Sequence, residues 1–236
     1  MSASTRCQLL TVVWFSALAT VSNAAETSSE PSSPLLTPIS LAFEPVFKHS
    51  FFVFGGRMSS TDIWSTAIYN LNDPNGRIQN YDNYIVGAAY QRDFIRLGGA
   101  FLIGAEIGLA DRFGNYPLCC HPVITSPSVV HSAELWSGLS LRYEALTVSQ
   151  VRFSPGIVWG LSAITSPIGQ ELEQAIGRNG NATILFYLGL EGAFSLVNFP
   201  STELVFRVHH RSGAFGTIGG MKEGNNSNVI GLRYRF

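Results

Sequence analysis

A histidine and a serine, His210 and Ser212, stand two residues apart in a segment that otherwise alternates apolar and polar residues. Side chains at i and i+2 of a β-strand project to the same side, so the imidazole could take a proton from the hydroxyl. This pair is the minimum of a serine hydrolase, which also needs a group that orients the histidine and a backbone N–H that stabilises the oxyanion. Gly213 leaves its N–H accessible and could provide that donor.

Candidates for the orienting group stand in the last alternating segment of the chain. Asn226 and Asn228 share the parity of its apolar residues, which is also the expected parity of His210. Either side-chain carbonyl could accept a hydrogen bond from the imidazole, as an asparagine does in cysteine–histidine sites. Both asparagines are therefore candidate catalytic residues, whereas Glu223 falls in the preceding loop.

The elements that would carry these residues are strands. Each alternating segment is long enough to cross a bilayer as a tilted strand of about 9 to 11 residues, and short connections alternate with long ones, as in bacterial outer-membrane barrels. We therefore predict an all-β fold, an eight-stranded antiparallel transmembrane β-barrel over residues 49–236. The eight segments lie at residues 49–58, 82–95, 99–111, 132–144, 148–163, 181–196, 201–212 and 226–236.

The alternation separates apolar side chains from small and charged ones. In the third segment Ile107 and Leu109 share one face, while Glu106 and Gly108 share the other. An eight-stranded barrel has an interior that side chains fill, so we expect its inward charges to pair with one another rather than line a pore. The expected inward set is Glu106, Glu134, Arg142, Arg152, Glu191, Glu203, Arg207, His209, Arg211, Arg233 and Arg235.

Two segments precede the barrel. Residues 1–24 have the pattern of a signal peptide, with Arg6, an apolar stretch and the small-x-small end Ser22-Asn23-Ala24. Residues 25–48 read as a flexible periplasmic leader that is too polar to fold alone, although residues 41–48 permit either a plug or a lead into the first strand. The protein is thus expected in the cell outer membrane, with His210 and Ser212 at the depth of the outer leaflet.

Charge and cysteine content argue against a nucleic-acid-binding protein and against a metal site. Once Arg6 is removed with the signal peptide, the 15 basic residues fall to 14, against 16 acidic ones, and they form no basic cluster. A nucleic-acid partner is therefore not expected. Cys119, Cys120 and His121 lack a fourth metal ligand, so we expect a loop disulfide or free thiols and no metal site.

The His-x-Ser pair on the penultimate strand of an eight-stranded barrel resembles the PagL-type lipid A 3-O-deacylases. The resemblance implies that Ser212 is the nucleophile and His210 the base, and that lipid A of lipopolysaccharide is the substrate. Two departures stand out, because the family usually has asparagine where this chain has Gly213 and a glutamate on the last strand where this chain offers Asn226 or Asn228.

The expected function is therefore lipid A acyl-ester hydrolysis by a serine esterase without a cofactor. The alternative is a non-catalytic structural or adhesive outer-membrane barrel whose long external loops bind a partner, with the His-x-Ser pair marking the membrane edge. A small-molecule channel is a third possibility, which a filled interior disfavours. The acyl position that is cut and the oligomeric state stay open at this point.

Overall fold

The computed structural model describes residues 42–43, 46–59, 83–115 and 129–236. The expected signal peptide, most of the expected leader, and Cys119, Cys120 and His121 lie outside these ranges. Two short strands, β1 (Ala42–Phe43) and β6 (Leu146–Val148), accompany eight long ones. The long strands are β2 (His49–Ser59), β3 (Asn83–Leu97), β4 (Phe101–Asn115), β5 (Val129–Tyr143), β7 (Val151–Ile164), β8 (Ile184–Leu196), β9 (Phe199–Ser212) and β10 (Asn226–Arg235).

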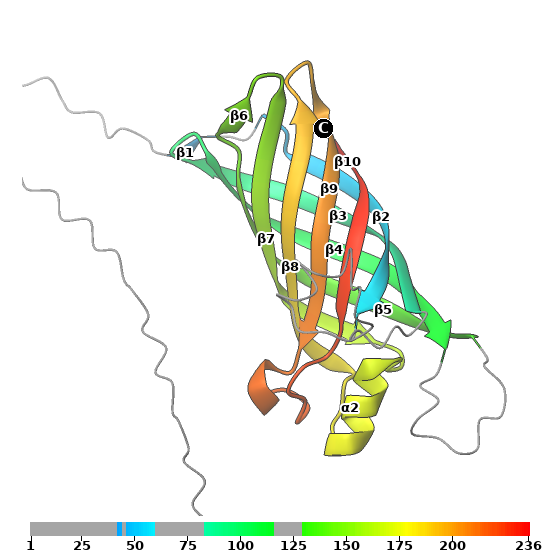
Figure 1. Ribbon diagram of the computed structural model, residues 1–236. Helices are drawn as coiled ribbons and strands as arrows, with labels where there is room; N and C mark the ends of the chain where they lie inside the picture. Colours follow the sequence, from blue (N-terminus) through cyan, green and yellow to red (C-terminus); the bar gives the residue numbers. More distant parts are fainter. Residues whose placement is uncertain (1–41, 44–45, 60–82, 116–128) are drawn as a thin grey trace, which may run out of the picture. The chain divides into compact units, whose positions relative to one another are not determined.

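The eight long strands form a closed barrel. Their order is β3-β2-β10-β9-β8-β7-β5-β4, and a further pairing of β3 with β4 joins the two ends of the sheet. Every pairing between them is antiparallel. Figure 1 shows the strands winding obliquely around a common axis. The predicted eight-stranded antiparallel barrel is thus confirmed.

Two connections differ from the sequence prediction. The segment predicted to begin at residue 148 begins as β7 at Val151, because the preceding β6 folds back on it through a turn at Ser149, which has a positive φ of 55°. The connection 164–180, predicted as a loop, contains helix α2 (Gln170–Arg178). Glu171 and Glu173 occupy its first turn, where carboxylates suit the helix dipole, and Asn179 ends it in a left-handed conformation.

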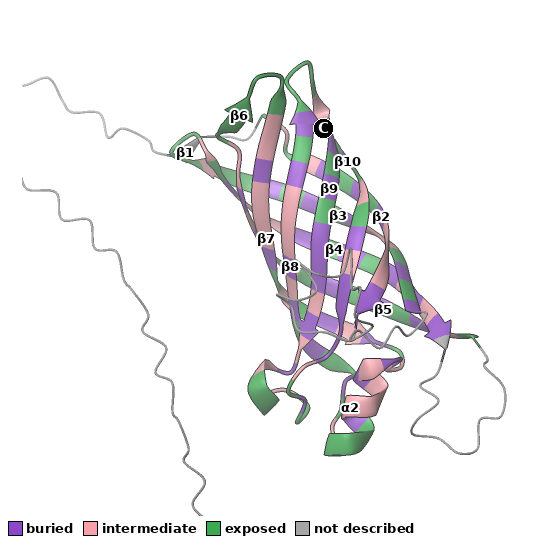
Figure 2. Cartoon of the chain, in the orientation of Figure 1, coloured by how far each residue is buried: buried purple, intermediate pink, exposed green. Residues whose placement is uncertain are grey.

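The outer wall of the barrel is apolar. In β4, Ile107 and Leu109 are 50 % and 60 % exposed, whereas the intervening Glu106 and Gly108 are buried. Figure 2 shows this alternation of exposed and buried residues along the strands. An apolar wall around a charged interior is stable in a bilayer and costly in water, so the barrel is a transmembrane one. Among the described residues, no helix is long and apolar enough to cross a membrane.

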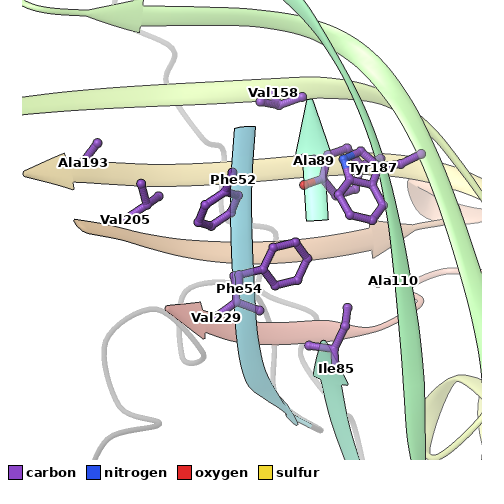
Figure 3. Close-up of a cluster of buried hydrophobic side chains, with 11 residues drawn as sticks. Phe52, Phe54, Ile85, Ala89, Ala110, Val158, Tyr187, Ala193, Val205 and Val229 are labelled. Carbon is purple, nitrogen blue, oxygen red and sulfur yellow. The ribbon is translucent and has the colours of Figure 1, made fainter. Parts of the chain in front are cut away.

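Aromatic and aliphatic side chains fill part of the interior. Phe52 and Phe54 of β2 belong to one buried cluster with Tyr187 of β8, and Figure 3 shows alanine, valine and isoleucine side chains of other strands in the same cluster. Trp136 completes this cluster beside Gly108, where an added Cβ would lie 2.0 Å from the indole ring. Only glycine therefore leaves room for this tryptophan.

Ion pairs fill the rest of the interior. Arg207 donates two hydrogen bonds of 2.7 Å to Glu106 and a third of 2.6 Å to Glu191, which also accepts one from Arg233. The inward charges therefore neutralise one another, as predicted. Arg152, also predicted to point inward, is only half-buried and lines a cavity at the end opposite α2.

Candidate active site

Strand β9 divides its side chains between the membrane and the interior. Leu204 and Phe206 are exposed on the outer wall, and His210 and Ser212 continue the same parity to the end of the strand. The intervening Arg211 is fully buried inside the barrel. The structure thus brings the two predicted site residues to one face, beyond the apolar stripe and at the end of the barrel that carries α2 (Figure 1).

The His210 side chain bonds to the neighbouring strand. Its partner in the ladder is Asn226 of β10, and the imidazole Nδ1 lies 2.5 Å from the Asn226 side-chain oxygen Oδ1. An amide oxygen only accepts hydrogen bonds, so Nδ1 must donate. A neutral imidazole that donates through Nδ1 carries its lone pair on Nε2. This is the tautomer that a general base of a serine hydrolase needs.

Asn228, the other candidate, is not brought to the histidine. It lies two residues further along β10 and pairs with Val208 rather than with His210. Glu223, in the loop before β10, lies close enough to His210 to interact with it electrostatically. Of the two asparagines proposed from the sequence, Asn226 is therefore the one in position to orient the imidazole.

The Ser212 hydroxyl is held by backbone groups. Its Oγ accepts a hydrogen bond of 3.1 Å from the N–H of Ala214 and lies 3.4 Å from the carbonyl oxygen of Lys222, to which it donates. Among the described residues, His210 is not one of its hydrogen-bond partners. The longer of these bonds is weak.

Gly213 is required by the loop that follows the strand. A Cβ at this position would lie 1.9 Å from the carbonyl oxygen of Met221, so no side chain fits without a backbone shift. Its own carbonyl accepts hydrogen bonds from the N–H groups of Gly216 and Ile218. Within the described part of the chain, its N–H has no backbone acceptor.

Comparison with known proteins found a similar solved structure but no relative by sequence. No family model matches the chain, and no curated protein matches it. The outer membrane enzyme PagL, known from a crystal structure, is similar to it. The match has a TM-score of 0.47 and 10 % sequence identity, and it covers 79 % of this chain and 99 % of PagL.

The contacts of Ala214 with Ser212 and of Met221 with Gly213 were not predicted from the sequence. Ala214 and the adjacent Phe215 both have positive φ, of 48° and 60°, and this turn aims the Ala214 N–H back at Ser212. Non-glycine residues seldom adopt this conformation, so the residue types carried no signal for it. Met221 is fully buried although it stands in a polar, glycine-rich stretch, and its contact with Gly213 depends on loop folding that has no sequence motif.

Proposed function

We propose that the protein is a serine esterase of the outer membrane that removes an acyl chain from lipid A. The observation that carries the proposal is the bond between His210 and Asn226, which leaves Nε2 as a base on the membrane-facing side. Ser212 stands two residues away on the same face. A short, partly buried hydrogen bond of this kind is unnecessary for a strand that merely ends at the headgroup region.

In the proposed reaction the Ser212 oxygen attacks the ester carbonyl while its proton passes to Nε2 of His210. Asn226 holds the resulting imidazolium, and the N–H groups of Gly213 and Ala214 stabilise the oxyanion. The intermediate collapses when the imidazolium returns its proton to the departing hydroxyl of lipid A. A water molecule then attacks the acyl-serine carbonyl while His210 takes its proton, and the imidazolium returns that proton to the Ser212 oxygen as the fatty acid leaves.

The surroundings of the pair favour a lipid ester as the substrate. Below the site on β9, Phe206 and Leu204 present an exposed apolar stripe along which an acyl chain can lie. Phe186 of β8, which pairs with Ser212 in the ladder, is also exposed and widens this stripe. Lipid A as the particular lipid is supported by the resemblance of the His-x-Ser pair to the PagL-type deacylases.

A non-catalytic structural or adhesive barrel is the second candidate function. The observation that favours it is the Ser212 hydroxyl, which bonds to Ala214 and Lys222 and not to the imidazole. In this alternative, His210 and Asn226 form a polar pair at the membrane edge. External loops would then bind a partner.

Hydrolysis by the purified protein separates the two functions. The barrel, folded in detergent, is incubated with lipid A, and released hydroxy fatty acid is measured by mass spectrometry. The proposal expects release by the wild type and none by Ser212→Ala or His210→Ala, while all three show the heat-modifiable migration of a folded barrel. Equal release by wild type and Ser212→Ala, or none from folded wild type, overturns the esterase.

A further inference from the structure

Helix α2 carries a buried acid into the mouth of the barrel. Glu171, in its first turn, is fully buried although the helix lies beyond the ends of the strands (Figure 1). Its carboxylate accepts a hydrogen bond of 2.8 Å from Arg112 of β4 and a second one from Arg211 of β9. One side chain of the helix thus joins two strands that lie far apart in the barrel sheet.

The charges around Glu171 balance only when its carboxylate is present. Arg112 and Arg211 lie 3.5 and 3.7 Å from the carboxylate of Glu134, so two guanidinium groups share two carboxylates. Removing one carboxylate would leave two buried cations with a single counter-charge, and an uncompensated buried charge is strongly destabilising. Glu171 therefore fixes α2 to the barrel mouth.

The helix in turn holds the loop that follows β9. Just beyond α2, the N–H of Asn181 donates a hydrogen bond of 2.7 Å to the carbonyl of Gly219 in that loop. Met221 of the loop is fully buried in an apolar cluster with Ala175 of the helix and Leu185 of β8. The loop is thus held by both a hydrogen bond and apolar packing against the helix and its connection to β8.

The loop also sets the position of Ser212. Met221 lies against Gly213 so closely that no Cβ fits between them, and the next residue, Lys222, accepts the hydrogen bond from the Ser212 hydroxyl. Arg211, which binds Glu171 through its side chain, also bonds to Asn225 of the loop through its backbone. Arg211, which stands between His210 and Ser212, is therefore held through its side chain by the helix and through its backbone by the loop.

We propose that α2 is a positioning element of this site. Glu171, held between Arg112 and Arg211, fixes the helix, and the helix fixes the loop from Gly213 to Asn225 through Met221. Ser212 and the N–H groups of Gly213 and Ala214 are thereby kept in one arrangement. This inference rests on the proposed esterase function, and Glu171 acts in it as a positioning residue that does not touch the substrate.

The test compares Glu171→Gln with Glu173→Gln in the full-length protein folded in detergent. Both changes remove one negative charge from the first turn of α2, but Glu173 is only half-buried and pairs with neither Arg112 nor Arg211. Two quantities are measured, the steady-state hydrolysis of lipid A and the hydrogen exchange of the loop N–H groups of Ile218 and Met221. Heat-modifiable migration checks that each barrel is folded.

In Glu171→Gln the loop amides should exchange at least about tenfold faster, and kcat should fall about a hundredfold, the loss typical of a misplaced reacting group. KM should change little, because the apolar wall that binds the acyl chain is untouched. Glu171→Asp, which keeps the charge, should recover part of the activity. Glu173→Gln should change both quantities much less than Glu171→Gln does.

The two readouts separate failure of the inference from failure of the esterase. If the wild type hydrolyses lipid A and Glu171→Gln does so with equal kcat and unchanged exchange, the inference is overturned and the esterase stands. If the wild type is inactive, the esterase fails, and the exchange still decides whether Glu171 holds the loop. Unchanged exchange in Glu171→Gln overturns the inference in either case.

Discussion

The Nδ1 atom of His210 and the Oδ1 atom of Asn226 face each other across strands β9 and β10 at a distance of 2.5 Å. The bond fixes the ring orientation and the tautomer together, and Ser212 stands two residues further along on the same face of β9.

Replacing this asparagine tests its role directly. In Asn226→Ala the imidazole loses the acceptor that fixes its tautomer, and kcat for lipid A hydrolysis should fall by about one to two orders of magnitude. Asn226→Asp should keep or raise kcat, because a carboxylate accepts the same bond and stabilises the imidazolium. Asn228→Ala is the matched control and should be nearly neutral. Equal losses in Asn226→Ala and Asn228→Ala would contradict the assignment.

The glycine after the serine should not tolerate an asparagine. Gly213→Asn places a Cβ where the carbonyl of Met221 lies, so the loop must move and the N–H groups beside Ser212 move with it. We expect loss of most activity and faster exchange of the loop amides. Gly177→Asn, in α2 where an added Cβ meets open space, is the control. Full activity of Gly213→Asn would show that the packing against Met221 is unimportant.

The interior ion pairs should contribute more to the unfolding free energy than the exposed pairs do. Glu106→Gln breaks a fully buried pair with Arg207 and should cost about 3 to 5 kcal/mol of unfolding free energy. Asp111→Asn breaks a pair with His131 whose side chains are 45 % and 64 % exposed, and should cost less than about 1 kcal/mol. Urea unfolding in lipid vesicles measures both. Similar midpoints for the two variants would contradict this ranking.

A carboxylate outside the strands should make stability depend on pH. Burial alone would raise the pKa of Glu144, but the guanidinium groups of Arg142, Arg235 and Arg96 hold that pKa below its usual range. A pKa that is lower in the folded state stabilises the fold above the unfolded-state pKa of about 4.3. This contribution is lost as pH falls below that value toward the folded pKa.

Glu144→Gln should therefore lower the urea midpoint at pH 7 and reduce the further loss between about pH 5 and pH 3, because the group that titrates is gone. The comparison is made on the difference between wild type and variant at each pH, since other carboxylates of the barrel titrate in both. A difference that stays constant down to pH 3 would show that Glu144 does not contribute.

The barrel was predictable because alternation is a local property of the sequence. Ile107 and Leu109 against Glu106 and Gly108 specify the two faces of β4 without knowledge of any other strand. The number and length of the predicted strands led to the prediction of a closed eight-stranded barrel, which the structure confirms. Helix α2 was missed because it is short and one of its two buried residues, Glu171, is an acid. Only the arrival of Arg112 and Arg211 from distant strands makes burial of Glu171 favourable.

The candidate site was partly predictable for the same reason. Parity placed His210, Ser212 and both asparagines on one face, but only the register between β9 and β10 decides that Asn226 rather than Asn228 meets the imidazole. The hydrogen bonds of Ser212 depend on the turn at Ala214 and on Lys222, ten residues further on. Their catalytic roles stay predictions.

The central claim is tested most directly by the mass of lipid A from a Gram-negative host that expresses the protein. Hosts expressing the wild type should contain lipid A lighter by one hydroxyacyl group, and hosts expressing equal amounts of folded Ser212→Ala should contain unmodified lipid A. Unmodified lipid A in both hosts, with the barrel folded in the outer membrane, would contradict the esterase function.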